Sequence, residues 1–230
     1  MKFLFISGFI FIAQTSFAYI PPGNFIIQSW GKKHPNLKSL RIESTVSLSG
    51  VQFKEITVYD LHAHALRSVV RDDAGHDLYR AEKSDSDVAL PTRLLLDSNA
   101  SAITALLKSQ GVANETVTLK RWKGSIAWVL GMPDAPELWI EKDTFLPLRL
   151  LLNSVSYDFS NYKFQHGMDY PKVIEVTKNN TLVLHDELGE IQINTGSDLK
   201  PQAATGYTEY GTGISQSMRD LIQQYYELIR

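Results

Sequence analysis

The sequence predicts an α+β protein made mainly of antiparallel β-structure. Short segments that alternate apolar and polar residues follow one another through most of the chain, separated by turns rich in Gly, Asn and Asp. Helical periodicity is confined to three short places, near the start, in the middle and at the end. Turns this short join antiparallel neighbours, because parallel strands need longer crossover connections.

The first 18 residues have the features of a secretory signal peptide. Lys2 precedes an apolar stretch from Phe3 to Ala13, and Ser16-Phe17-Ala18 supplies a small-x-small ending, so we expect cleavage after Ala18. The alternative, an uncleaved anchor, would need a longer apolar run. No other segment approaches the roughly 20 apolar residues that span a bilayer. We therefore expect a mature chain in the periplasm with no transmembrane segment.

Charge and cysteine content exclude several functions. The formal net charge is −2, and it becomes −3 once Lys2, the only charge in the signal peptide, is removed. This mildly acidic balance argues against nucleic acid as a partner. The chain has no cysteine, which excludes a disulfide scaffold, a cysteine-ligated metal, a thiol nucleophile and a lipid-modified N-terminal cysteine. We expect no cofactor.

The first half of the mature chain combines one helix with four strands. A short apolar helix follows Pro21-Pro22-Gly23-Asn24, contains Trp30 and ends by the Gly31 to Pro35 region. Four segments then read as an antiparallel meander: "SLRIESTVSLSG", "VQFKEITVYDLHA", "LRSVVRD" and "HDLYRAEK".

The middle of the chain interrupts this β-pattern. "KSDSD" reads as a polar loop, and "NASAITALLKSQG" reads as a short helix with Ile103, Leu106 and Leu107 on one face. Asp97 or Ser98 is the expected cap and Gly111 the expected stop. A helix this short is marginal alone, so we expect it to lie on an apolar surface.

A second run of strands follows, which brings the predicted total to about eleven. Its segments are "ETVTLKRW", "SIAWVLG", "ELWIE", "FLPLRLLL", "SYDFSNYKFQ", "YPKVIEVT", "TLVLHDE" and "EIQIN". A sheet with one wet face should alternate cleanly, but "SIAWVLG" and "FLPLRLLL" are apolar on both parities. These strands must therefore be covered on both faces.

The C-terminal segment changes character again. Residues 196–213 read as a flexible connection, and residues 214–230 as an amphipathic helix with apolar residues on a 3.6-residue period. The helix can dock on the domain's own core, or serve as a lid or an interface. The predicted organisation is thus a signal peptide at 1–18, a domain at 19–195, the connection and this helix.

The segments "RWKGSIAWVLG", "ELWIEKDTFLPLRLLL" and "YPKVIEV", placed after an N-terminal helix and a first meander, resemble the LolA/LolB-like superfamily of periplasmic lipoprotein carriers. The resemblance covers roughly residues 22 to 195. It implies a strongly curved, incomplete β-barrel with helices covering an apolar concave face. The sequence departs from the family at Arg67, which lacks a following proline, and in its additional C-terminal helix.

The resemblance implies a non-enzymatic carrier or chaperone that binds the acyl chain of a lipoprotein or a free lipid, with an envelope membrane complex as a further candidate partner. The alternative is an envelope structural or interaction protein whose cavity is filled by its own side chains. The candidate residues of the apolar cavity and its lid are Trp30, Phe53, Tyr59, Ile103, Leu106, Leu107, Trp122, Trp128, Trp139, Phe145, Leu148 and Leu150.

Other side-chain groups give weaker hypotheses. His62 and His64 share one face of a strand, as two metal ligands could, but no third ligand is evident. His166 with Asp169, or His76 with Asp72 and Asp73, could serve acid-base chemistry, although both groups lie in or near turns. Sequence motifs of hydrolases and phosphate-binding loops are absent. We therefore predict neither catalytic nor metal-binding residues.

Overall fold

The computed structural model describes residues 19–33, 37–61, 65–84, 90–195 and 208–229. The predicted signal peptide and the His62/His64 pair lie outside these ranges. The described chain forms one twelve-stranded sheet, a separate two-stranded hairpin and four helices. The strands are β1 (Ser39–Leu48), β2 (Val51–Asp60), β3 (Ala65–Arg71), β4 (Asp77–Ser84), β5 (Val117–Trp122), β6 (Ser125–Leu130), β7 (Glu137–Glu141), β8 (Pro147–Leu152), β9 (Val155–Ser160), β10 (Lys163–Gln165), β11 (Met168–Tyr170), β12 (Val173–Lys178), β13 (Thr181–Ile193) and β14 (Thr208–Tyr210).

The sheet is antiparallel throughout its described pairings, and its order is β14-β4-β3-β2-β1-β13-β12-β9-β8-β7-β6-β5. Its edge strands β14 and β5 do not pair with each other in the part of the chain described, so the sheet stays open. The predicted first meander is confirmed as β1 to β4. The long strand β13 pairs with β1 on one side and β12 on the other, and so joins the two meanders.

The structure describes fourteen strands where the sequence predicts about eleven. Strands β10, β11 and β14 have three residues each, too few to show an alternating pattern. In the other direction, "TLVLHDE" and "EIQIN" form the single strand β13. Between these two segments, at Gly189, the strand has a bulge opposite β1, where a Cβ on Gly189 would lie 2.9 Å from the Glu43 carbonyl oxygen.

The four helices are α1 (Gly23–Gly31), α2 (Leu90–Leu96), α3 (Ala100–Ser109) and α4 (Gln216–Ile229). The predicted cap of α3 was wrong: its N-cap is Asn99, whose side chain accepts hydrogen bonds from the backbone N–H groups of Ser101 and Ala102. Helix α2 was not predicted, because its apolar run "LPTRLLL" is too short to show a helical period. Part of the expected flexible connection forms β14, which pairs with β4.

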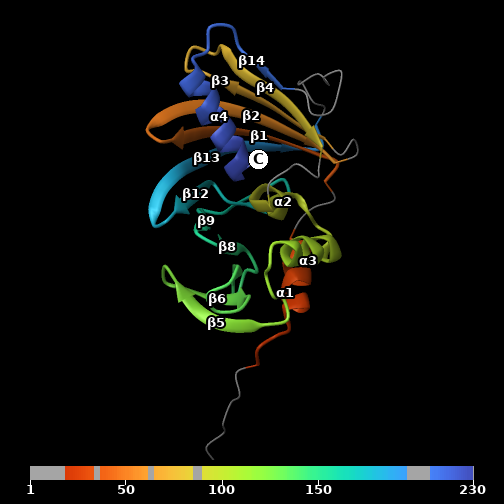
Figure 1. The fold of residues 1–230 in the computed structure, drawn as a ribbon. Coiled ribbons are helices and arrows are strands. Elements are labelled where there is room, and N and C mark those ends of the chain that lie inside the picture. The colour runs from red at the N-terminus through yellow and green to blue at the C-terminus, as the bar shows by residue number, and fades with distance from the viewer. Residues whose placement is uncertain (1–18, 34–36, 62–64, 85–89, 196–207, 230) are drawn as a thin grey trace, which may run out of the picture.

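All four helices contribute side chains to one hydrophobic core on a single face of the sheet. Figure 1 shows the sheet curving, with α4 lying across β1 to β4 and with α1, α2 and α3 grouped beside the strands of the second meander. We call this helix-covered face the concave face. It consists of alternate residues of each strand, such as Leu40, Val46 and Phe53.

None of the helices in the described ranges is long and apolar enough to cross a membrane.

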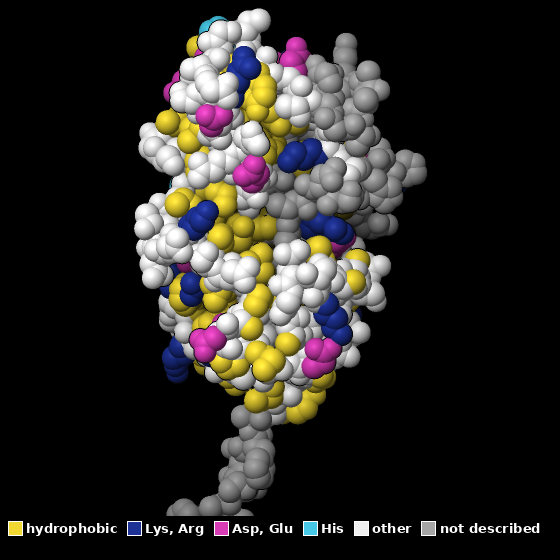
Figure 2. Space-filling model, in the orientation of Figure 1, with side chains coloured by type: hydrophobic (Ala, Val, Ile, Leu, Met, Phe, Trp, Pro, Cys, Tyr) yellow, Lys and Arg dark blue, Asp and Glu magenta, His cyan; other side chains and the backbone are white. Residues whose placement is uncertain are grey.

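Exposed apolar side chains include Ile20, Phe25, Leu119 and Ile126. Figure 2 shows hydrophobic side chains at the lower end of the molecule and also across the middle of this face, with Lys, Arg, Asp and Glu dispersed among them.

Candidate functional site

Helix α4 rests on the part of the concave face formed by β1 to β4. Four of its side chains, Ile222, Tyr225, Tyr226 and Ile229, are at most 3% exposed and belong to the main core. They recur at three- and four-residue intervals, so one face of the helix is apolar and the other faces solvent. The helix thus fills this part of the face.

Aromatic contacts position α4 against the sheet. The ring of Tyr225 lies edge-on to Phe53 of β2, with centroids 5.4 Å apart. The ring of Tyr226 lies 4.8 Å from that of Tyr79 in β4. At its C-terminal end, α4 is also held by Thr92 of α2, whose hydroxyl donates to the carbonyl oxygen of Ile229. These contacts fix the helix on two strands and on a neighbouring helix.

A buried carboxylate provides the polar attachment of α4. Glu55 of β2 is 1% exposed, and it accepts hydrogen bonds from the hydroxyls of Tyr225 at 2.7 Å and Tyr226 at 2.8 Å. Hydrogen bonds to a charged group contribute about 1.5–3 kcal/mol each, and the buried carboxylate would be costly without them. Glu55 therefore ties the C-terminal helix to the centre of the first meander.

Burial raises the pKa of two tyrosines at this contact, Tyr226 and Tyr79. It raises the pKa of Tyr226 well above its usual value, and the negative charge of Glu55 raises this pKa further. Burial likewise raises the pKa of Tyr79. Both side chains therefore stay neutral at physiological pH, and Tyr226 can donate its hydroxyl proton to Glu55.

The other half of the concave face is covered by α1 and α3. Trp30 of α1 is 1% exposed, and Ile103 and Leu107 of α3 are fully buried. Two glycines let the backbone approach closely here: a Cβ on Gly23 would lie 1.9 Å from the Asn114 carbonyl oxygen, and one on Gly31 would lie 2.7 Å from that of Ser98. These helices are thus fitted against backbone, whereas α4 is attached by side chains.

The structure brings nine of the twelve predicted cavity residues to the main core. Seven are buried there, and the other two are partly buried against it: Trp30, Phe53, Tyr59, Ile103, Leu107, Trp128 and Leu150 are buried, and Leu106 and Phe145 pack at its margin. Phe145 lies outside the strand in which it was predicted; its φ of 59° belongs to the turn before β8, where its ring contacts Phe25 at 6.1 Å. These side chains pack against the helices.

The remaining three predicted residues lie elsewhere. Trp122, Trp139 and Leu148 belong to a second, smaller cluster with Ala127 and Val129, on the opposite, convex face of the sheet. The two indole rings lie 5.8 Å apart, and the Arg149 guanidinium lies 4.2 Å from the Trp122 ring. The prediction that "SIAWVLG" is covered on both faces is met here by tryptophan side chains.

The histidines considered for acid-base chemistry, His76 and His166, lie in turns between strands. His76 Nδ1 lies 3.0 Å from Asp72 Oδ2 in the exposed turn between β3 and β4, where the Asp72 carboxylate also accepts from the His76 backbone N–H. That backbone hydrogen bond is the main reason the pKa of Asp72 is lowered, so the pair stabilises a turn. His166 has φ 52° in the turn between β10 and β11. Within the described ranges, no cluster of His, Cys, Asp and Glu could hold a metal ion.

Glu55 is not among the residues predicted from the sequence. It lies between Phe53 and Thr57 on the apolar parity of β2, where a charged residue breaks the pattern. That break was the available signal, because a buried carboxylate needs hydrogen-bond donors. Its donors come from Tyr225 and Tyr226, 170 and 171 positions later, which the local pattern of β2 cannot reveal.

Comparisons with known proteins give similar structures only. No protein-family model matches the chain, and no curated protein matches it. Similar solved structures include a DUF1329 family protein from Desulfovibrio piger, at 12% identity and TM-score 0.46, with 76% of this chain and 93% of that chain covered. Another is a LolA superfamily protein from Nitrosomonas europaea, at 10% identity and TM-score 0.44, with 78% and 96% covered.

A third similar structure is the MucA/MucB complex of Pseudomonas aeruginosa, at 14% identity and TM-score 0.33, with 76% of this chain and 58% of that chain covered. A LolA superfamily structure is thus among the similar ones. Identities and scores this low carry neither a ligand nor a partner over to this chain.

Proposed function

We propose that this chain is a non-enzymatic periplasmic binding protein that holds the acyl chain of a lipoprotein, or a free lipid, on the concave face of its sheet. Helix α4 acts as a displaceable cover over β1 to β4. The observation that carries the proposal is the way α4 packs on the sheet. This C-terminal amphipathic helix covers the apolar face over β1 to β4, and two tyrosine hydroxyls attach it there by hydrogen bonds to Glu55.

Helix α4 and an acyl chain gain comparable free energies when they are buried on the concave face. Burying four large side chains of α4 contributes on the order of 6–12 kcal/mol, at about 1.5–3 kcal/mol for each. An acyl chain of about 14 to 16 carbons gains on the order of 10 kcal/mol on leaving water, at about 0.8 kcal/mol per CH₂. Such a chain can therefore compete with α4, provided that it occupies the surface of Phe53, Val70 and Tyr79 under the helix.

Replacement of α4 by a ligand also changes the hydrogen bonds of Glu55. When the helix leaves, Glu55 loses both tyrosine donors, so its carboxylate must meet water or a polar group of the ligand. A lipid has a polar end as well as an acyl chain. The exchange is therefore favourable only where water or a hydrogen-bond donor at the polar end of the ligand reaches Glu55.

The test is direct binding. The exported protein, purified from a periplasm, is extracted with organic solvent for mass spectrometry of bound lipid, and the delipidated protein is titrated with a dansyl-labelled fatty acid. The proposal predicts co-purifying lipid and saturable uptake. A protein that carries no lipid and shows no saturable uptake contradicts it.

A second candidate is an envelope interaction protein that reuses the fold with a self-filled face. The observation that favours it is the continuity of the main core, in which side chains from all four helices already cover the sheet. This candidate predicts no uptake of fatty acid and recovery of a protein partner by crosslinking. Loss of that recovery on truncation after Asn194 would place the partner on the C-terminal segment.

A further inference from the structure

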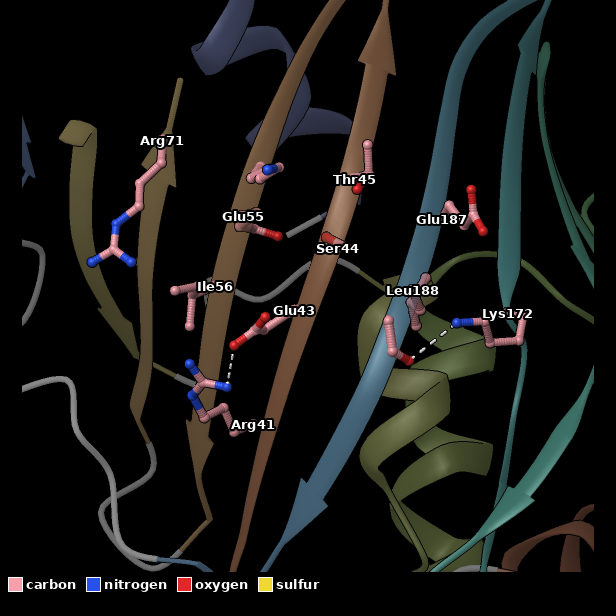
Figure 3. Close-up of a pocket in the computed structure, with 12 residues that line it drawn as sticks. Arg41, Glu43, Ser44, Thr45, Glu55, Ile56, Arg71, Lys172, Glu187 and Leu188 are labelled. Atoms are coloured by element: carbon pink, nitrogen blue, oxygen red, sulfur yellow. Dashed lines mark hydrogen bonds and ion pairs between the residues drawn. The ribbon is translucent and has the colours of Figure 1, made fainter. Parts of the chain in front are cut away.

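A polar groove of about 520 Å³ lies on the convex face of the sheet, opposite the helices. It crosses β3, β2, β1 and β13 beside the bulge at Gly189. In Figure 3, Arg71 and Glu187 stand on opposite sides of the strand that carries Thr45. Glu55 and Leu188, whose side chains belong to the helix-covered face, border the groove, but the charged residues argued below lie on the convex parity of their strands.

Strand register places four of the lining residues in one row. Arg71 of β3 is opposite Lys54 of β2, Lys54 is opposite Thr45 of β1, and Thr45 is opposite Glu187 of β13. Adjacent strands lie about 4.8 Å apart, so the backbones of Lys54 and Glu187 are about 10 Å apart across Thr45. The row has two cations at one end and a carboxylate at the other.

The cationic end has a surplus of positive charge. Like charges directly opposite each other destabilise a sheet, and Lys54 and Arg71 form such a pair. Arg71 Nε donates to Asp77 at 2.8 Å, but the same carboxylate also binds Arg80, so one negative charge serves two guanidinium groups. Lys54 has no ion-pair partner in the described part of the chain. An anion between Lys54 and Arg71 would relieve their repulsion.

The other end of the row has a carboxylate, that of Glu187, with no cationic side chain paired to it in the described residues. Glu187 is exposed and forms no ion pair within the described ranges. The nearby amine of Lys172 instead lies 3.3 Å from the Gly189 carbonyl oxygen, and Arg41 is bound to Glu43 at 2.6 Å. A ligand that fits the row is therefore an anion with a cationic group attached, not a simple anion.

We propose that this groove binds a zwitterionic phosphoester of the phosphoethanolamine type. The phosphate accepts hydrogen bonds from Lys54 and from the free terminal nitrogens of Arg71, and the ammonium group meets Glu187 above Thr45. The same chemistry occurs in free phosphoethanolamine and in the head group of a phospholipid.

Calorimetric titration of the full exported chain tests the site with phosphoethanolamine, inorganic phosphate and ethanolamine as separate probes. Phosphoethanolamine should bind about tenfold more tightly than phosphate, since one further charge-assisted contact is made. Lys54→Gln should weaken both phosphate-bearing probes about tenfold, whereas Glu187→Gln should remove only the advantage of phosphoethanolamine over phosphate. Lys178→Gln removes an exposed cation outside the groove and should change neither affinity.

The proposal is overturned if phosphoethanolamine does not bind, if it binds no better than phosphate, or if Lys54→Gln and Lys178→Gln behave alike. All three substituted residues are exposed, so unchanged far-ultraviolet circular dichroism is expected and serves as the folding control. A short-chain phosphatidylethanolamine separates the two sources: binding that is tighter than that of phosphoethanolamine and is weakened by Lys54→Gln indicates a lipid head group in the groove, and equal or weaker binding indicates the free molecule. Failure here leaves fatty-acid uptake unaffected, so the two proposals can fail independently.

Discussion

The carboxylate of Glu55 in β2 accepts a hydrogen bond from the hydroxyl of Tyr225 in α4 at 2.7 Å, across 170 positions of the chain. Both groups are almost fully buried, and Tyr226 completes the contact from the next position. The last helix of the protein is thereby attached to the middle of its first meander. Stability, pH dependence and ligand uptake should all respond to this attachment.

Removing the hydroxyls should loosen α4 while keeping its apolar contacts. Tyr225→Phe should lower the free energy of unfolding by about 1–3 kcal/mol, because the buried carboxylate loses a donor. Hydrogen exchange of the α4 backbone amides should become faster than in the wild type. Tyr157→Phe is the control, since Tyr157 is buried in β9, away from α4, and has no such carboxylate contact. Equal effects of the two changes would contradict the role of Glu55.

Stability should fall at high pH through the buried tyrosines. Burial raises the pKa of Tyr157 to about 12 from 10.0, and it raises the pKa of Tyr226 well above its usual value. A group whose folded-state pKa is raised binds its proton more tightly when folded, so its contribution is full below pH 10 and is lost as pH rises through the folded pKa. Chemical denaturation from pH 9 to pH 12 should show this loss, and Tyr226→Phe should make it smaller. An equally steep loss in that variant would contradict the assignment.

The close approach at the start of α1 predicts a large effect of one methyl group. Gly23→Ala should destabilise the protein by about 1–3 kcal/mol through overpacking, since the added Cβ would lie 1.9 Å from the Asn114 carbonyl oxygen. Gly50→Ala is the matched comparison, because its Cβ would meet nothing within 4 Å and only its left-handed backbone, at φ 81°, is unfavourable. Thermal denaturation compares the two. A smaller loss for Gly23→Ala than for Gly50→Ala would contradict the fit of α1.

The convex-face tryptophans should be irrelevant to acyl binding. Trp122→Leu removes the contact with the Arg149 guanidinium at 4.2 Å and should cost about 0.5–1 kcal/mol of stability. Affinity for a dansyl-labelled fatty acid should stay within about twofold of the wild type, because Trp122 lies in the cluster on the face away from the helices. If Trp122→Leu lost fatty-acid binding, Trp122 would have to be part of the binding site, which would contradict this prediction.

The sequence predicted those parts of the fold that depend on local pattern. The alternation in β1 to β4, and the 3.6-residue period of α4, are visible within a dozen residues. The short α2 and the three-residue strands β10, β11 and β14 carry too few residues for any period.

The candidate site was predictable only in part, for a different physical reason. The period of two says that Trp122 lies on the other face from Leu119, but it does not say which face the helices cover. Leu148 lies at the irregularity in the β7 and β8 pairing, between Pro147 and Arg149, and strand alternation cannot predict its face. The attachment of α4 to Glu55 depends on contacts distant in sequence.

The most direct test of the central claim is the position of α4 with and without an acyl ligand. Because the chain has no native cysteine, spin labels can be placed at Gln224→Cys on the exposed side of α4 and at Gln52→Cys on β2, with Gln52→Cys and Lys178→Cys as a sheet-to-sheet control pair. Pulsed electron paramagnetic resonance should show that saturating fatty acid lengthens and broadens the first distance and leaves the control distance unchanged. An unchanged α4 distance in ligand-saturated protein would contradict the account.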